Sequence, residues 1–208
     1  MKRLDFDLPS RATWVFTGDS ITQGVHHTHG SRSWVELVSE RVRWELGRVE
    51  DIVVNSGVSA WTAHEISADF EYLVGRFAPQ VLSVSLGTND ALDGEPGLVS
   101  FHRRLTEIVR RASSIRSTVI LHTPLLVMPD APAPRREWLT AYAEVIRTIA
   151  TNEGAILVDH EQHWHQHFRT EYPTAWMDDS THPNAVGHRH IAETTLQTLR
   201  LGSLREQF

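Results

Sequence analysis

WVFTGDSITQG, residues 14–24, changes character at Gly18. The residues before this glycine are apolar or β-favouring, and an Asp-Ser pair follows it directly. Such a change is expected where a strand ends at the carboxyl edge of a parallel sheet, the edge at which open α/β folds bind their ligands. A serine on that turn, Ser20, stands clear of its strand, and nearby backbone N–H groups can face an anion. The stretch therefore predicts a nucleophilic serine, provided that a base removes its proton.

The best candidate for that base lies near the other end of the chain, in DSTHPN, residues 179–184. A histidine that activates a serine needs a carboxylate to hold its ring, and Asp179 precedes His182 by three residues. Asp178 is a second carboxylate within reach of the same histidine. The residue types therefore predict a Ser–His–Asp arrangement, with two candidates for the aspartate.

Strand and helix patterns alternate five times along the chain. We expect strands at 14–16, 51–55, 81–86, 118–121 and 155–158, and helices at 34–47, 62–77, 98–115, 138–151, 161–169 and 185–199. Three prolines in residues 128–134 predict an irregular loop there. This alternation predicts a mostly parallel sheet with helices on both faces. The turns after the first three strands, which carry Ser20, Gly57 and Asn89, should then meet at one edge.

Composition and charge restrict the class of protein. With 208 residues, 40% of them apolar and 22% charged, the chain is expected to form one soluble domain spanning 1–208. A net charge of −6 offers no electrostatic attraction for nucleic acid or for an anionic membrane. The absence of cysteine excludes disulfides and thiolate-bound zinc. Residues 1–9 predict no signal peptide, and no stretch is apolar enough to span a membrane, so a cytoplasmic location is expected.

Four segments together resemble the four sequence blocks of the SGNH hydrolases, also called the GDSL esterase and lipase family. Gly18–Ser20 matches the first block, Gly57 lies in the second, and Gly87–Asp90 matches the third. Asp179 and His182 match the fourth, with the family's spacing of three residues. Each block alone is a weak signal, but all four occur in order, each on a turn of the predicted kind. The resemblance extends over the whole chain.

The resemblance implies a role for each residue. Ser20 would be the nucleophile, His182 its base and Asp179 the group that orients the histidine. The oxyanion hole would consist of the backbone N–H groups of Ser20 and Gly57 and the side-chain amide of Asn89. A glycine at 57 would let the backbone approach the substrate closely. The family's spacing and the direction that a one-turn loop allows favour Asp179 over Asp178.

Other polar residues near these turns have a structural interpretation. Asp19 and Asp90 are expected to accept hydrogen bonds from turn backbone. Histidines are frequent at 26–29 and 163–167, but residues two apart on a helix face different ways, which makes the second group a poor ligand set. We therefore expect no functional metal and no cofactor, although loop 26–29 could bind a metal adventitiously. His188, like His190, is expected to face solvent from the last helix.

Three tryptophans bear on the pocket and the core. Trp61 follows the turn of Gly57, and it could either line the substrate pocket or pack that turn onto its helix. Trp34 and Trp138 are expected on the core faces of their helices.

The residues and the resemblance together predict a flavodoxin-like, three-layer α/β/α fold with a mostly parallel five-stranded sheet. The expected activity is hydrolysis of carboxylic esters, with short acyl or acetyl esters of a sugar or small metabolite as the substrate class. Short loops without a lid offer little apolar surface for a long acyl chain. The alternatives are a thioesterase or acyltransferase on the same fold, or an ester- or carbohydrate-binding protein with a relic site. A small-molecule ester is the only partner expected, and the oligomeric state stays open.

Overall fold

Five parallel strands form the centre of the protein in a computed structural model that describes residues 8–204. They are β1 Thr13–Gly18, β2 Ile52–Asn55, β3 Val81–Ser85, β4 Thr118–His122 and β5 Ile156–Val158. Their order in the sheet is β2-β1-β3-β4-β5, and every pair is parallel. This is the flavodoxin-like order, whose direction reverses between β1 and β3. The predicted five-stranded sheet is confirmed, while the amino end before residue 8 lies outside the described residues.

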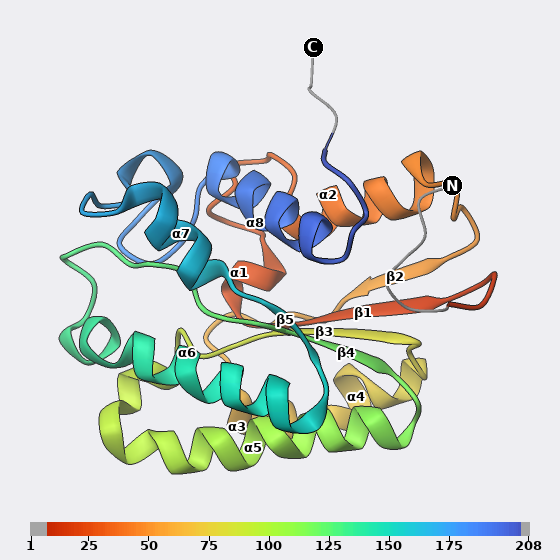
Figure 1. Ribbon diagram of the computed structural model, residues 1–208, viewed down its shortest axis with the longest axis horizontal. Helices are drawn as coiled ribbons and strands as arrows, with labels where there is room; N and C mark the ends of the chain where they lie inside the picture. Colours follow the sequence, from red (N-terminus) through yellow and green to blue (C-terminus); the bar gives the residue numbers. More distant parts are fainter. Residues whose placement is uncertain (1–7, 205–208) are drawn as a thin grey trace.

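Helices cover both faces of the sheet, as the alternating pattern predicts (Figure 1). Helices α2, α7 and α8 lie on one face, and α3, α4, α5 and α6 lie on the other. The α-helices are α1 Ser20–Gln23, α2 Trp34–Glu40, α3 Ala63–Ala68, α4 Phe70–Leu73, α5 Gly94–Ser114, α6 Ala133–Glu153, α7 His160–Phe168 and α8 Ala185–Thr198. A π-helical turn, Arg41–Glu45, continues α2 within the range predicted for that helix.

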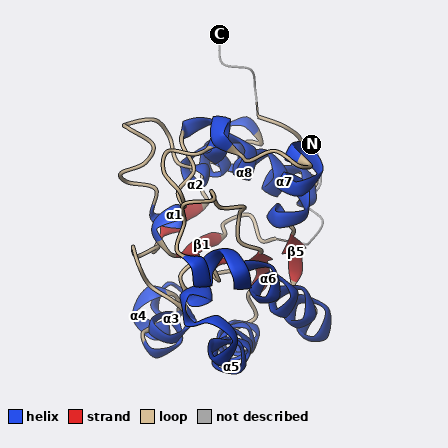
Figure 2. Ribbon diagram, turned by 90° about the vertical axis from the view of Figure 1, so that its left-hand side faces the viewer, coloured by secondary structure: helices blue, strands red, loops and turns tan. Residues whose placement is uncertain are grey.

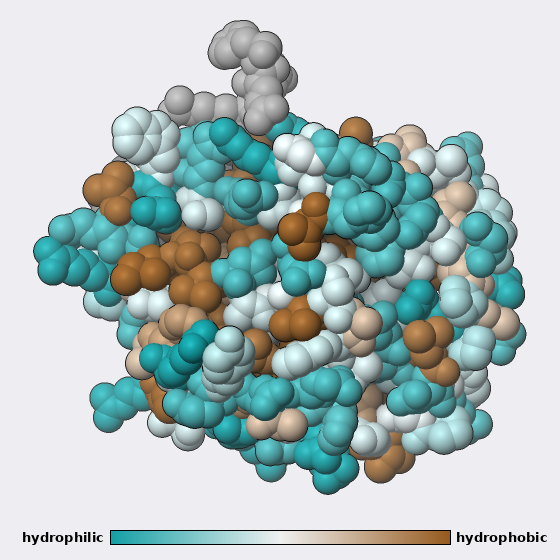
Figure 3. Space-filling model, turned by 180° about the vertical axis from the view of Figure 1, so that it is seen from behind, coloured by the Kyte–Doolittle hydropathy of each residue, from teal (hydrophilic) through white to brown (hydrophobic). Residues whose placement is uncertain are grey.

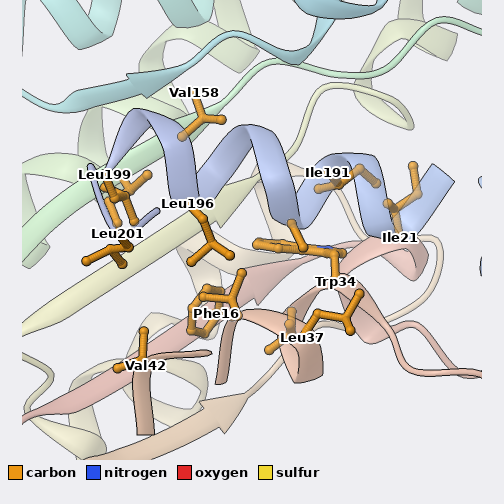
Figure 4. Packing of buried hydrophobic residues seen from close by; sticks show 14 of the residues in the cluster. Phe16, Ile21, Trp34, Leu37, Val42, Val158, Ile191, Leu196, Leu199 and Leu201 are labelled. Carbon is orange, nitrogen blue, oxygen red and sulfur yellow. The ribbon is translucent and has the colours of Figure 1, made fainter. Parts of the chain in front are cut away.

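Successive residues of β1 point to opposite faces, because side chains alternate along a strand. Trp14 and Phe16 join the core beneath α2 and α8, where Phe16 packs edge-on against Trp34 with ring centroids 5.4 Å apart. Figure 4 shows this cluster, with Leu196 of α8 close to Phe16. Val15 joins the second core, beneath α3 to α6. The sheet therefore separates two apolar cores and fixes the position of the strand ends.

Two helix predictions need correction. The helix expected at 62–77 is broken into α3, α4 and a 3₁₀ turn, and the breaks fall at Asp69 and beside Gly75, both weak helix formers. Helix α6 begins at Ala133, inside the stretch expected to be irregular. Pro134 lies in its first turn, where a helix needs no N–H donor from that residue.

The carboxyl ends of the strands form the edge that Figure 2 shows face-on, with α1 and α6 on opposite sides of it. Seen from behind in Figure 3, the surface carries brown apolar patches set among teal polar residues. One exposed apolar side chain is Ile52 of the edge strand β2, which is 60% accessible. Within residues 8–204, no helix is both long and apolar enough to cross a membrane.

Candidate active site

Ser20 is the first residue of α1, directly after the end of β1. The turn requires Gly18, because a Cβ at that position would collide with the carbonyl oxygen of Ser85 on β3. Asp19 caps the helix, with its Oδ1 accepting from the Ile21 backbone N–H at 2.9 Å. Burial raises the pKa of Asp19 to about 7, against the opposing effect of that hydrogen bond. The predicted strand-end turn is therefore present, and it presents Ser20 at the carboxyl edge.

The serine meets the histidine predicted from the far end of the chain. The Ser20 Oγ lies 2.9 Å from Nε2 of His182. On the other side of the ring, Nδ1 lies 2.8 Å from Oδ2 of Asp179 and 3.0 Å from its Oδ1. Three residues separated by up to 162 positions thus form one continuous chain of hydrogen-bond contacts.

The loop around Asp179 holds this carboxylate ionised. Its Oδ1 accepts from the backbone N–H groups of Thr181 and His182, each at 2.7 Å. Burial acts to raise the pKa of Asp179, but these hydrogen bonds outweigh burial and leave the pKa below its ordinary value. Burial lowers the pKa of His182, with the hydrogen bond that its Nδ1–H donates to Asp179 opposing the shift. The resting histidine is therefore held neutral near pH 7, as a base must be.

Gly57 lies against the first turn of α1. Its backbone N–H donates to Oδ1 of Asn55 at 3.0 Å, and the Asn55 amide donates to the Thr22 carbonyl at 2.8 Å. A Cβ on Gly57 would lie 2.6 Å from the backbone nitrogen of Gln23, closer than real Cβ atoms approach. Packing against α1, a contact that sequence reasoning missed, therefore requires glycine here.

Asn89 follows β3 on the other side of the point where the strand order reverses. Its Nδ2 donates to the Trp61 carbonyl at 3.1 Å, and its Oδ1 accepts from Nη2 of Arg135 at 3.1 Å. Trp61 also packs against the second core, so the packing interpretation of this residue holds. Asp90 accepts from the backbone N–H groups of Ala63 and Gly87, as predicted, and burial raises its pKa to about 6.

A second histidine–aspartate pair, His27 with Asp178, lies against the pair formed by His182 and Asp179, and sequence reasoning did not find it. The ring of His27 stacks on that of His182, with centroids 3.7 Å apart and planes within 6°. Asp178 holds His27 Nδ1 at 2.9 Å and His29 Nε2 at 2.6 Å, and these two contacts lower the pKa of Asp178. The carboxylates of the adjacent aspartates therefore hydrogen-bond to different histidines, and Asp179 is the one whose carboxylate contacts the ring of His182.

The histidines were the least predictable group. Among the described residues, one set could supply three metal ligands, since ligand atoms of His27, Asp179 and His182 lie within 4.8 Å of one another. The prediction that His188 faces solvent is wrong: it is 1% exposed, and its Nδ1 accepts from the Trp34 backbone N–H at 3.2 Å. The helical spacing of His188 with Ile191 is the signal that could have shown this.

Comparison with known proteins places this geometry among characterised families. The profile of the GDSL-like lipase/acylhydrolase family matches residues 16–190. An acetylxylan esterase from Geobacillus stearothermophilus is 26% identical over an alignment of 202 residues that covers 89% of this chain and 92% of that protein. The crystal structure of an acetylxylan esterase from that organism superimposes with a TM-score of 0.80 at 24% identity, covering 94% of this chain and 97% of that one. An α/β hydrolase from the metagenome of Lake Arreo gives a TM-score of 0.78 at 23% identity, covering 91% and 95%.

A three-layer fold around a parallel sheet, with a Ser–His–Asp contact at the carboxyl edge of that sheet, is typical of the class of serine-dependent hydrolases. The family profile matches most of the chain and identifies which family of these hydrolases it belongs to. This protein belongs to the GDSL-like lipase/acylhydrolase family, and it is a carboxylic ester hydrolase. The resemblance read from the four sequence blocks is therefore confirmed.

Proposed function

We propose that this enzyme removes acetyl and other short acyl groups from esters of sugars, using Ser20, His182 and Asp179 as its catalytic triad. The observation that carries the proposal is the unbroken contact chain from Ser20 Oγ through both nitrogens of His182 to Asp179. The two apolar cores share one sheet, which supports a single domain acting as the catalytic unit.

In the first half of the reaction, Ser20 Oγ attacks the ester carbonyl while His182 Nε2 takes the hydroxyl proton. Asp179 stabilises the imidazolium that forms and keeps its Nδ1 proton directed at the carboxylate. His182 then gives the proton to the departing sugar hydroxyl, which leaves an acyl group on Ser20. In the second half, water takes the place of the sugar, and the same histidine acts first as base and then as acid.

In the transition state, negative charge develops on the carbonyl oxygen of the ester, and this oxyanion needs hydrogen-bond donors. The backbone N–H of Ser20 and the Asn89 amide are the donors that we assign to it, together with the backbone N–H of Gly57, which the oxyanion would share with Oδ1 of Asn55, its acceptor at 3.0 Å. One hydrogen of the Asn89 Nδ2 is directed to Trp61, and the second is the one assigned to the oxyanion. Each such donor typically contributes ~3–4 kcal/mol of transition-state stabilisation.

Two observations support a sugar as the alcohol. The related protein of similar length from Geobacillus stearothermophilus is an acetylxylan esterase, and its catalytic mutants replace a serine, an aspartate and a histidine. A cavity of about 360 Å³ also lies next to the loop that carries the histidine: none of the triad residues lines it, but Met128 does, and Met128 donates its N–H to the Ser180 carbonyl at 2.9 Å. Arg136, Glu161 and Tyr172 are among its lining residues, and they offer hydrogen bonds and a ring to sugar hydroxyls and faces.

The test compares substrates and then removes the nucleophile. Acetate release from acetylated xylo-oligosaccharides is measured beside a series of nitrophenyl esters of increasing acyl length. We expect the acetyl esters to be cleaved fastest and Ser20→Ala to be inactive on all of them, with its thermal midpoint close to that of the parent. An organophosphonate should add covalently to Ser20 in the parent alone.

Two kinds of outcome would contradict the proposal, one concerning the nucleophile and one concerning the reaction. Full activity in Ser20→Ala, or labelling at another serine in parallel with inactivation, would exclude Ser20 as the nucleophile. Faster cleavage of acyl thioesters, or acyl transfer to an added alcohol in preference to water, would instead favour the thioesterase or acyltransferase alternative.

A further inference from the structure

One buried guanidinium joins the two halves of the site. Arg135 lies in the first turn of α6 and is 8% exposed. Its Nε donates to the Thr88 carbonyl at 2.8 Å, and its Nη1 donates to Thr181 Oγ1 at 2.8 Å. Its Nη2 donates to Asn89 Oδ1 at 3.1 Å. The turn after β3 and the loop that carries the histidine are therefore held by the same side chain.

These contacts determine which way the Asn89 amide faces. A guanidinium carries only donors, so the atom of Asn89 that meets Arg135 has to be the carbonyl oxygen. The NH₂ group then faces away from Arg135, where Trp61 accepts one of its hydrogens. A flipped amide would place donor against donor, and such a buried mismatch is costly.

The charge of Arg135 is the second observation. No carboxylate among residues 8–204 forms an ion pair with it, although it is buried. Burial lowers the pKa of Arg135, while Asp19 and Asp179 act in the opposite direction, and arginine stays protonated in proteins. A buried cation without an ion-pair partner destabilises the resting protein. A negative charge that develops beside Asn89 would offset that cost, and it does so only during the reaction.

We propose that Arg135 is a positioning residue for ester hydrolysis: it orients the Asn89 amide toward the oxyanion, braces Thr181 in the catalytic loop and supplies a fixed positive charge behind the oxyanion hole. This inference rests on the proposed roles of Ser20, Asn89 and His182. Since a direct oxyanion donor is worth 10²–10³ in kcat, an indirect support should be worth about 10–100-fold.

The experiment uses a neutral variant, a charged variant and a matched arginine control on another helix. Arg135→Gln should lower kcat on nitrophenyl acetate by about 10–100-fold with KM within about twofold, the pattern of an interaction made in the transition state. Arg135→Lys should keep the charge but lose the fork of donors, and fall between the parent and Arg135→Gln. Arg103→Gln, the same change at an exposed arginine on α5, should leave kcat at the parental value.

A rescue experiment separates positioning from a purely structural role. Adding millimolar guanidinium ion to Arg135→Ala should restore part of the lost kcat, and urea at the same concentration should not. Parental kcat in Arg135→Gln, or an equal loss in Arg103→Gln, would overturn the inference. If the thermal midpoint shows that Arg135→Gln does not fold, the kcat of Arg135→Lys is the deciding measurement. Parental kcat in Arg135→Lys, together with no rescue of Arg135→Ala by guanidinium, would count against a positioning role. Activity in Ser20→Ala would instead refute the proposed function itself.

Discussion

Replacing Asp179 by Asn should almost abolish turnover, while the same replacement at Asp178 should not. The two aspartates are adjacent and differ in what they hold. Asp179 contacts both the backbone and the ring of His182, whereas Asp178 holds His27 and His29. The pair therefore offers a matched test, in which the same chemical change is made one residue apart.

The structure fixes how an asparagine at 179 would be oriented. Oδ1 of Asp179 accepts from the backbone N–H groups of Thr181 and His182 at 2.7 Å, so the carbonyl oxygen of Asn has to occupy that position. Its NH₂ group then replaces Oδ2, 2.8 Å from Nδ1 of His182. A donor there requires Nδ1 to accept, which moves the ring proton to Nε2, the atom facing Ser20. A protonated Nε2 cannot take the hydroxyl proton.

The expected loss follows from that change of tautomer. In the best-studied serine triad the corresponding substitution lowers kcat by about 10⁴, which corresponds to about 5.5 kcal/mol of activation free energy. Both backbone hydrogen bonds to residue 179 survive, so the thermal midpoint should change little. Asp178→Asn leaves the Asp179–His182 contact intact and should cost less than about tenfold, through looser stacking of His27.

The assay is hydrolysis of nitrophenyl acetate, with the rate of phosphonylation of Ser20 measured in parallel. Phosphonylation reports on the attack by Ser20 without a deacylation step, and it should slow in step with kcat for Asp179→Asn. Equal losses in the two variants, or a larger loss for Asp178→Asn, would refute the assignment of Asp179.

Further outcomes concern the oxyanion hole, protonation and metals. Asn89→Ala should lower kcat by about 10²–10³ with little change in KM, and a change confined to KM would make Asn89 a ground-state binding residue. Because burial lowers the pKa of His182, the acid limb of kcat/KM should have its midpoint below about 6.5, and a midpoint above that value would contradict the shift. Burial lowers the pKa of His160 to about 3, so stability should be lost as pH falls from about 6.5 toward 3. When pH falls from 6.5 to 4.5, the free energy of unfolding measured in urea should therefore decrease by about 2–3 kcal/mol less in His160→Gln than in the parent. Equal decreases in the two proteins would refute this. Prolonged chelation followed by desalting should leave hydrolysis unchanged, and a loss restored by one divalent ion would direct attention to His27 and its neighbours.

The positions predictable from sequence are those that follow directly from strand ends. Ser20, Gly57 and Asn89 each follow a strand that ends in a small or polar turn, and parallel pairing brings such ends to one edge. The contact of Ser20 with His182 was predicted in the same way, because the loop before the last helix reaches that edge. Strand pairing is a strong constraint, and it needs no knowledge of side-chain detail.

Residues that reach the site from helices and loops were missed, although one of them left a signal. Arg135 lies one turn before Leu139 on the buried stripe of α6, which continues through Tyr142 and Ile146. A charged residue on an otherwise apolar stripe needs buried partners, so its position indicated a specific role. No comparable pattern marks His27, because its stacking on His182 depends on the path of an irregular loop.

The loop that carries Asp179 and His182 belongs to no strand of the sheet, so its geometry depends on contacts made one by one. A single β-bridge, Met177 to Pro183, closes its base, and the N–H of Met128 holds the Ser180 carbonyl. Arg135 holds Thr181 from one side, and Asp178 is held from the other by loop 26–29. Catalysis requires the base to be placed within about half an ångström. Contacts outside the proposed triad therefore determine whether Nε2 of His182 meets Ser20. Substitution of the residues that make these contacts should lower kcat markedly while the free energy of unfolding changes little.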